Sequence, residues 1–243
     1  MKQSVFTTIV LAAAFAIATV IFFTILPEFI VKGGYLVIAL IALLIMLITF
    51  IFERIFSLGK AQGKGSITVF LKAVQQAINT GDIDSAISAC DKQRGSCANI
   101  VRTGLERYKT LIEDGDIKAQ KAVMEEVNHA IEEATMLEVP LLERNLVAMS
   151  TIASISTMVG LLGTVIGMIR SFAALGASGA TDAQQLSIGI SEALINTAGG
   201  IAAGIGGIVA YNFFVTKVDN FTYMIDEASY SIVQSLVTRK GKK

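Results

Sequence analysis

A single carboxylate interrupts the last long apolar stretch of the chain. Glu192 is the only charged residue between Leu186 and Val215. A carboxylate inside a membrane span costs roughly 3 kcal/mol or more, and it usually faces a partner or a water path. Glu192 is therefore either a group that handles an ion or proton, or a structural carboxylate near the interface that is hydrogen-bonded to Asn196 or Ser191.

Hydroxyl side chains recur along the preceding apolar stretch. They fall near one face of a helix that turns about 100° per residue, and they are Ser150, Ser154, Thr157, Thr164 and Ser171. Gly163 and Gly167 form a GxxxG pair on a neighbouring face. Small and hydroxyl residues also line ordinary helix interfaces in membranes, so the periodicity alone leaves helix packing as an equal interpretation.

Glycines crowd the last apolar stretch at positions 199, 200, 204, 206 and 207. A helix this bare needs other backbones close to it, which indicates a tight assembly of helices. Two faces separate by angle. Glu192 and Asn196 begin one face, and Thr197, Gly200, Gly204 and Gly207 lie on the other. Glu192 and Thr197 are about 140° apart around the helix axis, so a single pore beside this helix cannot be lined directly by both side chains.

The composition places these residues in a membrane protein. Charged residues make up 16% of the 243-residue chain and hydrophobic residues 53%, against about 25% charge in a soluble domain. Four stretches are long and apolar enough to cross a bilayer core, which takes about 20 helical residues: Val5–Leu26, Gly34–Phe52, Asn145–Ile169 and Leu186–Val215. We read the first as an uncleaved membrane helix; an interfacial helix and a signal peptide are the alternatives.

Lys and Arg placement predicts the topology and the domains. Basic residues follow the second stretch and end the chain, and none occurs from Ser171 to Gln185. We therefore expect a cytoplasmic N-terminus, middle region and C-terminus. The domains we expect are two N-terminal apolar helices (1–52), a cytoplasmic helical region (53–144), a transmembrane hairpin (145–215) and a C-terminal helix with a basic tail (216–243).

The middle region has helical periodicity throughout. We expect helices over 67–79, capped by Ser66, over 96–113, with Val101, Leu105, Tyr108 and Ile112 buried, and over 116–138. The apolar stripe of the last of these runs from Val123 to Leu137. Pro140 then either kinks that helix or starts the next one.

Soluble-enzyme and metal motifs are missing from the sequence. It has no Walker loop, zinc spacing or nucleophile elbow, and Cys90 and Cys97 are seven residues apart without a histidine cluster nearby. We expect two free thiols, no cofactor, no metal and no enzymatic activity. The zero net charge gives no reason to expect nucleic acid as a partner.

Two longer motifs resemble the MotA/TolQ/ExbB proton-channel family. Residues 159–168, VGLLGTVIGM, are similar to its GLLGTVxGM signature, and residues 189–200, GISEALINTAGG, to its GIxEALxxTxxG signature. Residues 210–212, AYN, match its ending. The resemblance is strong from Pro140 to Asn212 and weak in the middle region. Two signatures in the right order on adjacent spans make chance an unsatisfactory explanation.

The resemblance implies an all-α membrane protein with three to four transmembrane helices, long helices reaching into the cytoplasm, and a homo-oligomeric ring. ExbB-like members form pentamers in the bacterial inner membrane around single-span ExbD-like partners, whose membrane aspartate carries the proton. By match, Thr164 and Thr197 stand near that aspartate, and Glu192 matches the family's glutamate. Coupling then passes to a TonB-like protein. Packing in the ring would use Gly163, Gly167, Gly200, Gly204 and Gly207.

Two departures from the family pattern qualify this picture. Thr157 stands where the family often has proline, and an extra apolar segment, Val5–Leu26, precedes the first span expected. Within the family, TolQ-like, gliding-motor and MotA-like rings are the alternatives. Outside it, a passive membrane scaffold is the main rival, and a membrane enzyme is the weakest.

Overall fold

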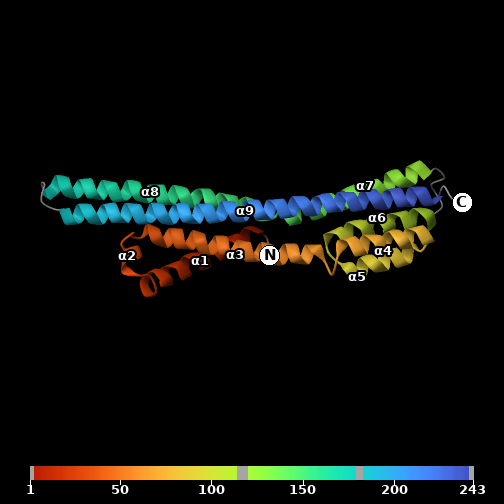
Figure 1. The fold of residues 1–243 in the computed structure, drawn as a ribbon, viewed down its shortest axis with the longest axis horizontal. Coiled ribbons are helices and arrows are strands. Elements are labelled where there is room, and N and C mark those ends of the chain that lie inside the picture. The colour runs from red at the N-terminus through yellow and green to blue at the C-terminus, as the bar shows by residue number, and fades with distance from the viewer. Residues whose placement is uncertain (1–2, 114–119, 179–182, 241–243) are drawn as a thin grey trace. The chain divides into compact units, whose positions relative to one another are not determined.

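The computed structural model describes residues 3–113, 120–178 and 183–240, and the regular structure in these ranges is helical (Figure 1). Its helices, in chain order, are α1 (Gln3–Thr24), α2 (Glu28–Val31), α3 (Leu36–Gln62), α4 (Ile67–Thr80), α5 (Ile83–Gln93), α6 (Ser96–Glu113), α7 (Gln120–Glu143), α8 (Leu146–Ser178) and α9 (Ala183–Lys240).

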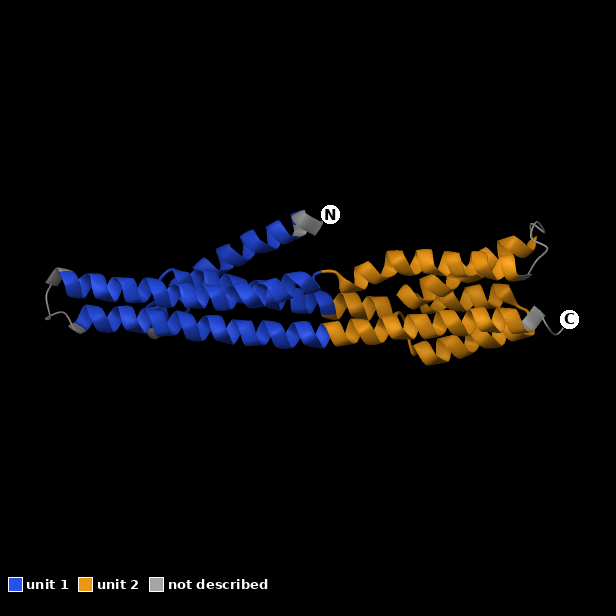
Figure 2. Ribbon diagram, turned by 90° about the horizontal axis from the view of Figure 1, so that it is seen from above, with its two compact units in different colours: residues 1–54, 145–214 blue, residues 55–144, 215–243 orange. Residues whose placement is uncertain are grey.

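Contacts divide the chain into two compact units (Figure 2). Unit 1 comprises residues 1–54 and 145–214, and unit 2 comprises residues 55–144 and 215–243. The helices α3 and α9 each contribute residues to both units.

Unit 1 contains the apolar helices. By length and composition, four helical segments of the described ranges can cross a membrane. They are Thr7–Thr24, Leu36–Thr80, Lys121–Gly176 and Gln184–Thr238. Among the described side chains of α1, those counted as buried hydrophobic are Ala14, Ala18 and Phe22, so this helix presents most of its apolar surface outward. An all-α membrane protein is the class that such helices define.

The helices of unit 1 exceed the stretches predicted from hydropathy. α3 continues ten residues past Phe52, to Gln62, and α8 continues to Ser178. We expected the stretch Ser171–Gln185, which has no Lys or Arg, to be the loop between the last two apolar stretches. This expectation is wrong at both ends of the stretch, because residues 171–178 and 183–185 are helical. Its middle, including Asp182, lies outside the described residues.

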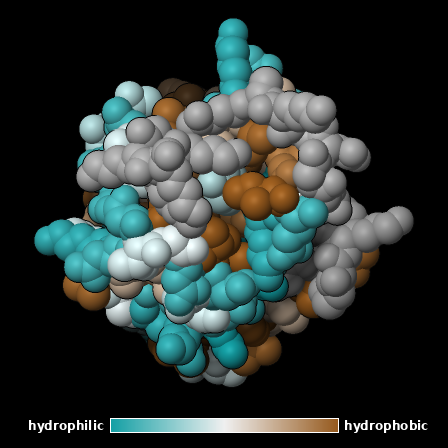
Figure 3. All heavy atoms as spheres, turned by 90° about the vertical axis from the view of Figure 1, so that its right-hand side faces the viewer, coloured by the Kyte–Doolittle hydropathy of each residue, from teal (hydrophilic) through white to brown (hydrophobic). Residues whose placement is uncertain are grey.

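Unit 2 is a bundle of α4–α7 and the last part of α9. Consecutive helices contact one another, α4 with α5, α5 with α6 and α6 with α7. The fully buried side chains include Val74, Ile78, Ile100, Leu105, Ile225 and Ile232. Figure 3 views this end of the chain and shows hydrophilic side chains around a smaller hydrophobic area. Each helix thus turns an apolar stripe inward and a charged face outward.

Two predicted helices of unit 2 are confirmed with corrections. α6 has the predicted bounds, but Ile112 is exposed and Leu111 is buried in its place. α4 begins and ends as expected within one residue, and Gly81 closes it in the left-handed conformation. Ser66 occupies the N-cap position as predicted, although its side chain forms no capping hydrogen bond.

The third predicted helix ends later than expected. Of its range, residues 116–119 lie outside the described residues, and α7 runs from Gln120 to Glu143. Val123 and Val127 are buried, whereas Leu137 is exposed. Pro140 lies inside α7, and the break before α8 falls instead at Asn145, where φ is 65°.

Helix α5 was missed by the sequence reasoning. Asp82 begins it, with its carboxylate accepting hydrogen bonds from the Ser85 amide at 2.9 Å and the Ser85 hydroxyl at 2.6 Å. These hydrogen bonds lower the pKa of Asp82. The sequence signal was a short one, an N-cap residue directly after the glycine that ends α4.

Candidate functional site

The two helices that carry the longest motifs touch backbone to backbone. A Cβ atom added at Gly200 would lie 2.6 Å from the Ser156 carbonyl oxygen and 2.7 Å from the Gly160 Cα. One added at Gly160 would lie 2.9 Å from the Asn196 carbonyl oxygen. Only hydrogen fits at these two positions. Figure 1 shows α8 and α9 side by side along this stretch.

The remaining packing glycines lie on the same contact. A Cβ at Gly163 would meet Asn196, one at Gly167 would meet Ala193, and one at Gly204 would meet Thr157. Gly207 faces Ala153 in the same way. We expected these glycines to bring together the helices of a ring, but the contacts seen here join α8 and α9 of one chain. Gly206 has nothing within 4 Å.

The close contact brings two hydroxyl groups together. Thr164 Oγ1 on α8 and Thr197 Oγ1 on α9 are hydrogen-bonded to each other. Thr197 Oγ1 can also donate to the Ala193 carbonyl at 3.0 Å or the Gly160 carbonyl at 3.4 Å. Both side chains are half-buried. Each hydroxyl is one donor and two acceptor positions, so the pair retains capacity to accept a further hydrogen bond.

Glu192 is held by an arginine on the neighbouring helix. Arg170 Nη1 donates to both carboxylate oxygens, at 2.7 and 2.9 Å, and the Glu192 side chain is 9% exposed against 59% for Arg170. No role was predicted for Arg170 from the sequence, although this residue directly follows the third apolar stretch. The arrangement neutralises a buried charge, which membrane carboxylates require.

Glu192 and Asn196 both face the α2–α3 turn. Asn196 Nδ2 donates to the Gly33 carbonyl at 2.7 Å and to the Glu192 carbonyl at 3.0 Å. Gly34 has φ +74°, and a Cβ there would overlap Glu192 Oε1. The structure thus joins Thr164 to Thr197 but leaves Glu192 on a different face of α9, as the angular argument from the sequence requires.

A second buried charge lies at the other end of unit 1 and was missed as a site. Arg54 is 0% exposed and donates to both carboxylate oxygens of its neighbour Glu53, at 2.8 and 2.7 Å. Asn145 Nδ2 donates to Glu53 Oε2 at 3.0 Å. The sequence reasoning counted Arg54 only toward topology, because nothing in the pattern indicates that it is buried.

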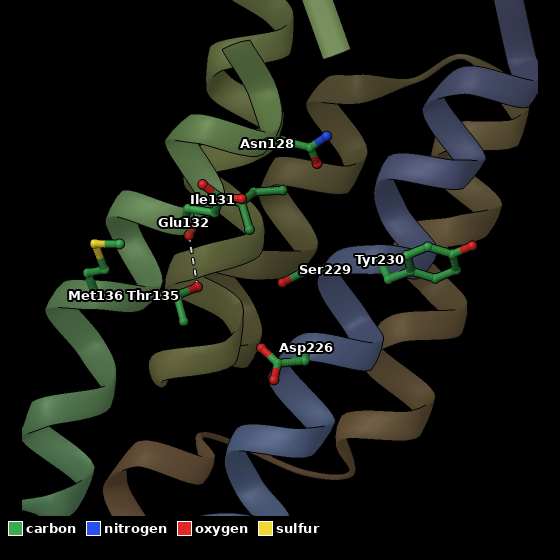
Figure 4. A pocket seen from close by; sticks show the side chains of 8 residues that line it. All are labelled: Asn128, Ile131, Glu132, Thr135, Met136, Asp226, Ser229 and Tyr230. Carbon is green, nitrogen blue, oxygen red and sulfur yellow. Dashed lines mark hydrogen bonds between the residues drawn. The ribbon is translucent and has the colours of Figure 1, made fainter. Parts of the chain in front are cut away.

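Unit 2 has a cavity of about 320 Å³ between α7 and α9 (Figure 4). Glu132 and Thr135 line it from α7, and Asp226, Ser229 and Tyr230 from α9. The Ser229 hydroxyl is buried without a hydrogen-bond partner among the described residues. Two carboxylates make this cavity acidic.

The fold places the chain in the class of α-helical membrane proteins. Within this class, its α8–α9 pair is joined by glycine contacts and carries polar side chains inside apolar helices. The chain belongs to the MotA/TolQ/ExbB proton channel family, whose model matches residues 92–227. Proteins of this family are membrane-integral subunits of proton-channel motors.

The individual proteins that this chain resembles include both ExbB and TolQ proteins. The putative biopolymer transport protein ExbB-like 3 of Synechocystis is 41% identical over 87 residues, which are 35% of this chain and 41% of that protein. TolQ of the Tol-Pal system of Pseudomonas aeruginosa is 34% identical over 146 residues, 60% of this chain and 58% of that protein. The biopolymer transport protein ExbB of Helicobacter pylori is 42% identical over 78 residues, 32% of this chain and 54% of that protein. The chain thus spans about half the length of these relatives.

Proposed function

We propose that this chain is the ring subunit of a proton-driven motor in the bacterial inner membrane. In this proposal the chain forms a pentamer, and an ExbD-like single-span protein brings the membrane aspartate that carries the proton. The observation that supports it most directly is the hydrogen-bonded pair of Thr164 and Thr197. Two hydroxyls placed in contact within an apolar hairpin are what a proton-accepting carboxyl from a partner would need.

The chemistry of the pair follows from its hydrogen-bonding capacity. When Thr197 donates to a backbone carbonyl, its oxygen can still accept a hydrogen bond from a carboxylic acid or a water. After deprotonation the same hydroxyl can turn and donate to the carboxylate. The pair would therefore stabilise both protonation states of the partner's aspartate, which is what stepwise proton release requires.

Glu192 has a secondary part in this proposal. It lies one to two helical turns from Thr197 on another face of α9, and Arg170 donates hydrogen bonds to its carboxylate. We assign it to the end of the proton pathway, where a fixed ion pair shapes the local field without carrying the proton itself.

The test is the double variant Thr164→Val and Thr197→Val. Valine matches threonine in shape, so the chain should assemble with its partner at normal levels while motor output is lost. The readouts are copurification of the partner and motor-dependent uptake of siderophore- or vitamin-type substrates. Full output from the double variant would instead support a passive scaffold.

The coupled partner distinguishes two roles within the family. Our first candidate is a role in transport across the outer membrane, with a TonB-like protein as the coupled partner. A TolQ-like role is the second, and it is favoured by the long match to TolQ of Pseudomonas aeruginosa. Expression of the chain in strains lacking either ExbB or TolQ decides between them, by restored uptake in one and restored envelope integrity in the other.

A further inference from the structure

In unit 2, the turn that follows α3 packs directly against the turn that follows α5. The amide of Lys64, after α3, donates to the carbonyl of Gln93, the last residue of α5, at 2.7 Å. Gly63 and Gly95 have φ of +77° and +91°, and a Cβ on either would overlap the backbone of the opposite turn. The backbone of this region is therefore fixed in one arrangement.

Arg94 occupies a backbone conformation that other residues avoid. It has φ 56° and ψ 174°, close to a region that is essentially restricted to glycine. Its side chain is exposed, so it gains no burial energy that would offset the backbone strain. Strained residues of this kind cluster at sites that clamp a ligand.

A cavity of about 530 Å³ opens at these turns. Lys60, Lys64 and Arg94 line it, and Glu138 is the carboxylate in its wall. Glu138 already accepts a hydrogen bond from Asn99 at 2.9 Å. Within the described ranges, none of the three cations forms an ion pair. The cavity therefore has an excess of positive charge and donors for an anion.

The position of Lys60 along α3 places this charge beside a bilayer. From Leu36 to Phe56 the helix rises about 30 Å, the thickness of a hydrocarbon core. Lys60 follows about 6 Å further on, within a headgroup layer of about 5–8 Å. Leu141, which is 56% exposed, adds apolar surface to the same cavity.

From these observations we infer that the cavity binds the phosphate of an anionic phospholipid. Lys60, Lys64 and Arg94 hold the phosphodiester, and Leu141 contacts the glycerol and the first carbons of the acyl chains. Basic pockets at the cytoplasmic end of membrane helices recognise lipid headgroups in this way. The inference concerns unit 2 and does not depend on the proton pathway.

The experiment measures lipid retained by the full chain. The protein is reconstituted in vesicles of equal parts phosphatidylglycerol and phosphatidylcholine, extracted in mild detergent, and analysed by mass spectrometry. We expect selective retention of phosphatidylglycerol. Lys60→Gln with Lys64→Gln should reduce it by about fivefold for each charge removed, and Lys60→Arg with Lys64→Arg should keep it. The matched control removes Lys72 and Lys121, two exposed lysines of unit 2 outside the cavity.

Arg94→Gly separates a binding role from a structural one. Glycine relieves the backbone strain, so the thermal midpoint should rise while phosphatidylglycerol retention falls. A lower midpoint would overturn the inference, because Arg94 would then be stabilising the fold. Equal loss in the Lys72 and Lys121 control would also overturn it. So would absence of lipid preference together with displacement by millimolar inorganic phosphate, which would indicate a soluble ligand.

Discussion

At the scale of single residues, two pairs of polar side chains join α8 to α9 in unit 1. Thr164 contacts Thr197, and Glu192 is bound by Arg170. A hydroxyl pair is neutral and can exchange partners, whereas the Glu192 carboxylate is 9% exposed and would be left as an uncompensated buried charge without Arg170. The two pairs therefore suit different tasks, transfer for the first and positioning for the second.

Removing Arg170 should lower the stability of the chain more than removing Glu192. Arg170→Gln leaves a carboxylate that is 9% exposed without its cation, whereas Glu192→Gln leaves a mostly exposed guanidinium. We expect the arginine variant to lower the thermal midpoint of the detergent-solubilised chain more, and Glu192→Gln to give intermediate motor output. A double-mutant cycle should give a coupling of about 1–3 kcal/mol. Additive effects would show that the two charges do not interact.

At the scale of elements, α8 and α9 form one packed pair whose contact is made of backbone. Such packing gains dispersion energy and needs little side-chain ordering, which is why small residues dominate membrane helix interfaces. The contact also fixes the register of the two helices, and that register places Thr164 opposite Thr197. Positioning of the hydroxyl pair thus depends on glycines that have no chemistry of their own.

Gly200 and Gly206 provide a matched test of this contact. Gly200→Ala would force a methyl group into the α8 backbone, whereas Gly206→Ala meets open space. We expect the first to lose most of the folded chain, and the second to be neutral or stabilising by up to about 1 kcal/mol, since alanine is the better helix former. Yields and thermal midpoints measure both.

The same reasoning applies to Gly204→Leu. We expected Gly204 to pack against a neighbouring helix of a ring, but a Cβ at this position meets Thr157 of the same chain, so Gly204→Leu should destabilise the chain itself first. A Gly206→Ala variant as unstable as Gly200→Ala would show that the exposed face of α9 is packed equally tightly in the assembly.

At the scale of the whole molecule, the chain combines apolar helices in unit 1 with a charged helical bundle in unit 2. The topology that we predict puts unit 2 in the cytoplasm. Native cysteines cannot report on it. Burial is the main cause that raises the pKa of the Cys90 thiol to about 12 and that of Cys97 to about 11, so neither supplies reactive thiolate near pH 8 on either side of the membrane.

An engineered cysteine resolves the topology. In a chain with both native cysteines replaced by alanine, Ser88→Cys lies on the exposed face of α5, and Gly176→Cys lies in open space near the end of α8. An impermeant maleimide in intact spheroplasts should label position 176 and not 88, and both should react after lysis. Labelling of position 88 in intact spheroplasts would reverse the predicted orientation.

The sequence by itself determined the class of this protein. Hydropathy located the spanning helices because a bilayer imposes both length and apolarity, and the two motifs indicated the family and the threonines. Angular spacing alone separated Glu192 from Thr197, since a helix fixes the direction of every side chain relative to its neighbours.

Only the tertiary structure decided which groups meet. Arg170 and Glu192 are 22 residues apart and Glu53 and Asn145 are 92 apart, and no local pattern encodes such pairs. The same holds for the two turns that strain Arg94, because their contact depends on how α3 and α5 end relative to each other. Local residue types set helices and faces, whereas contacts between distant segments are set by packing that the whole chain must satisfy at once.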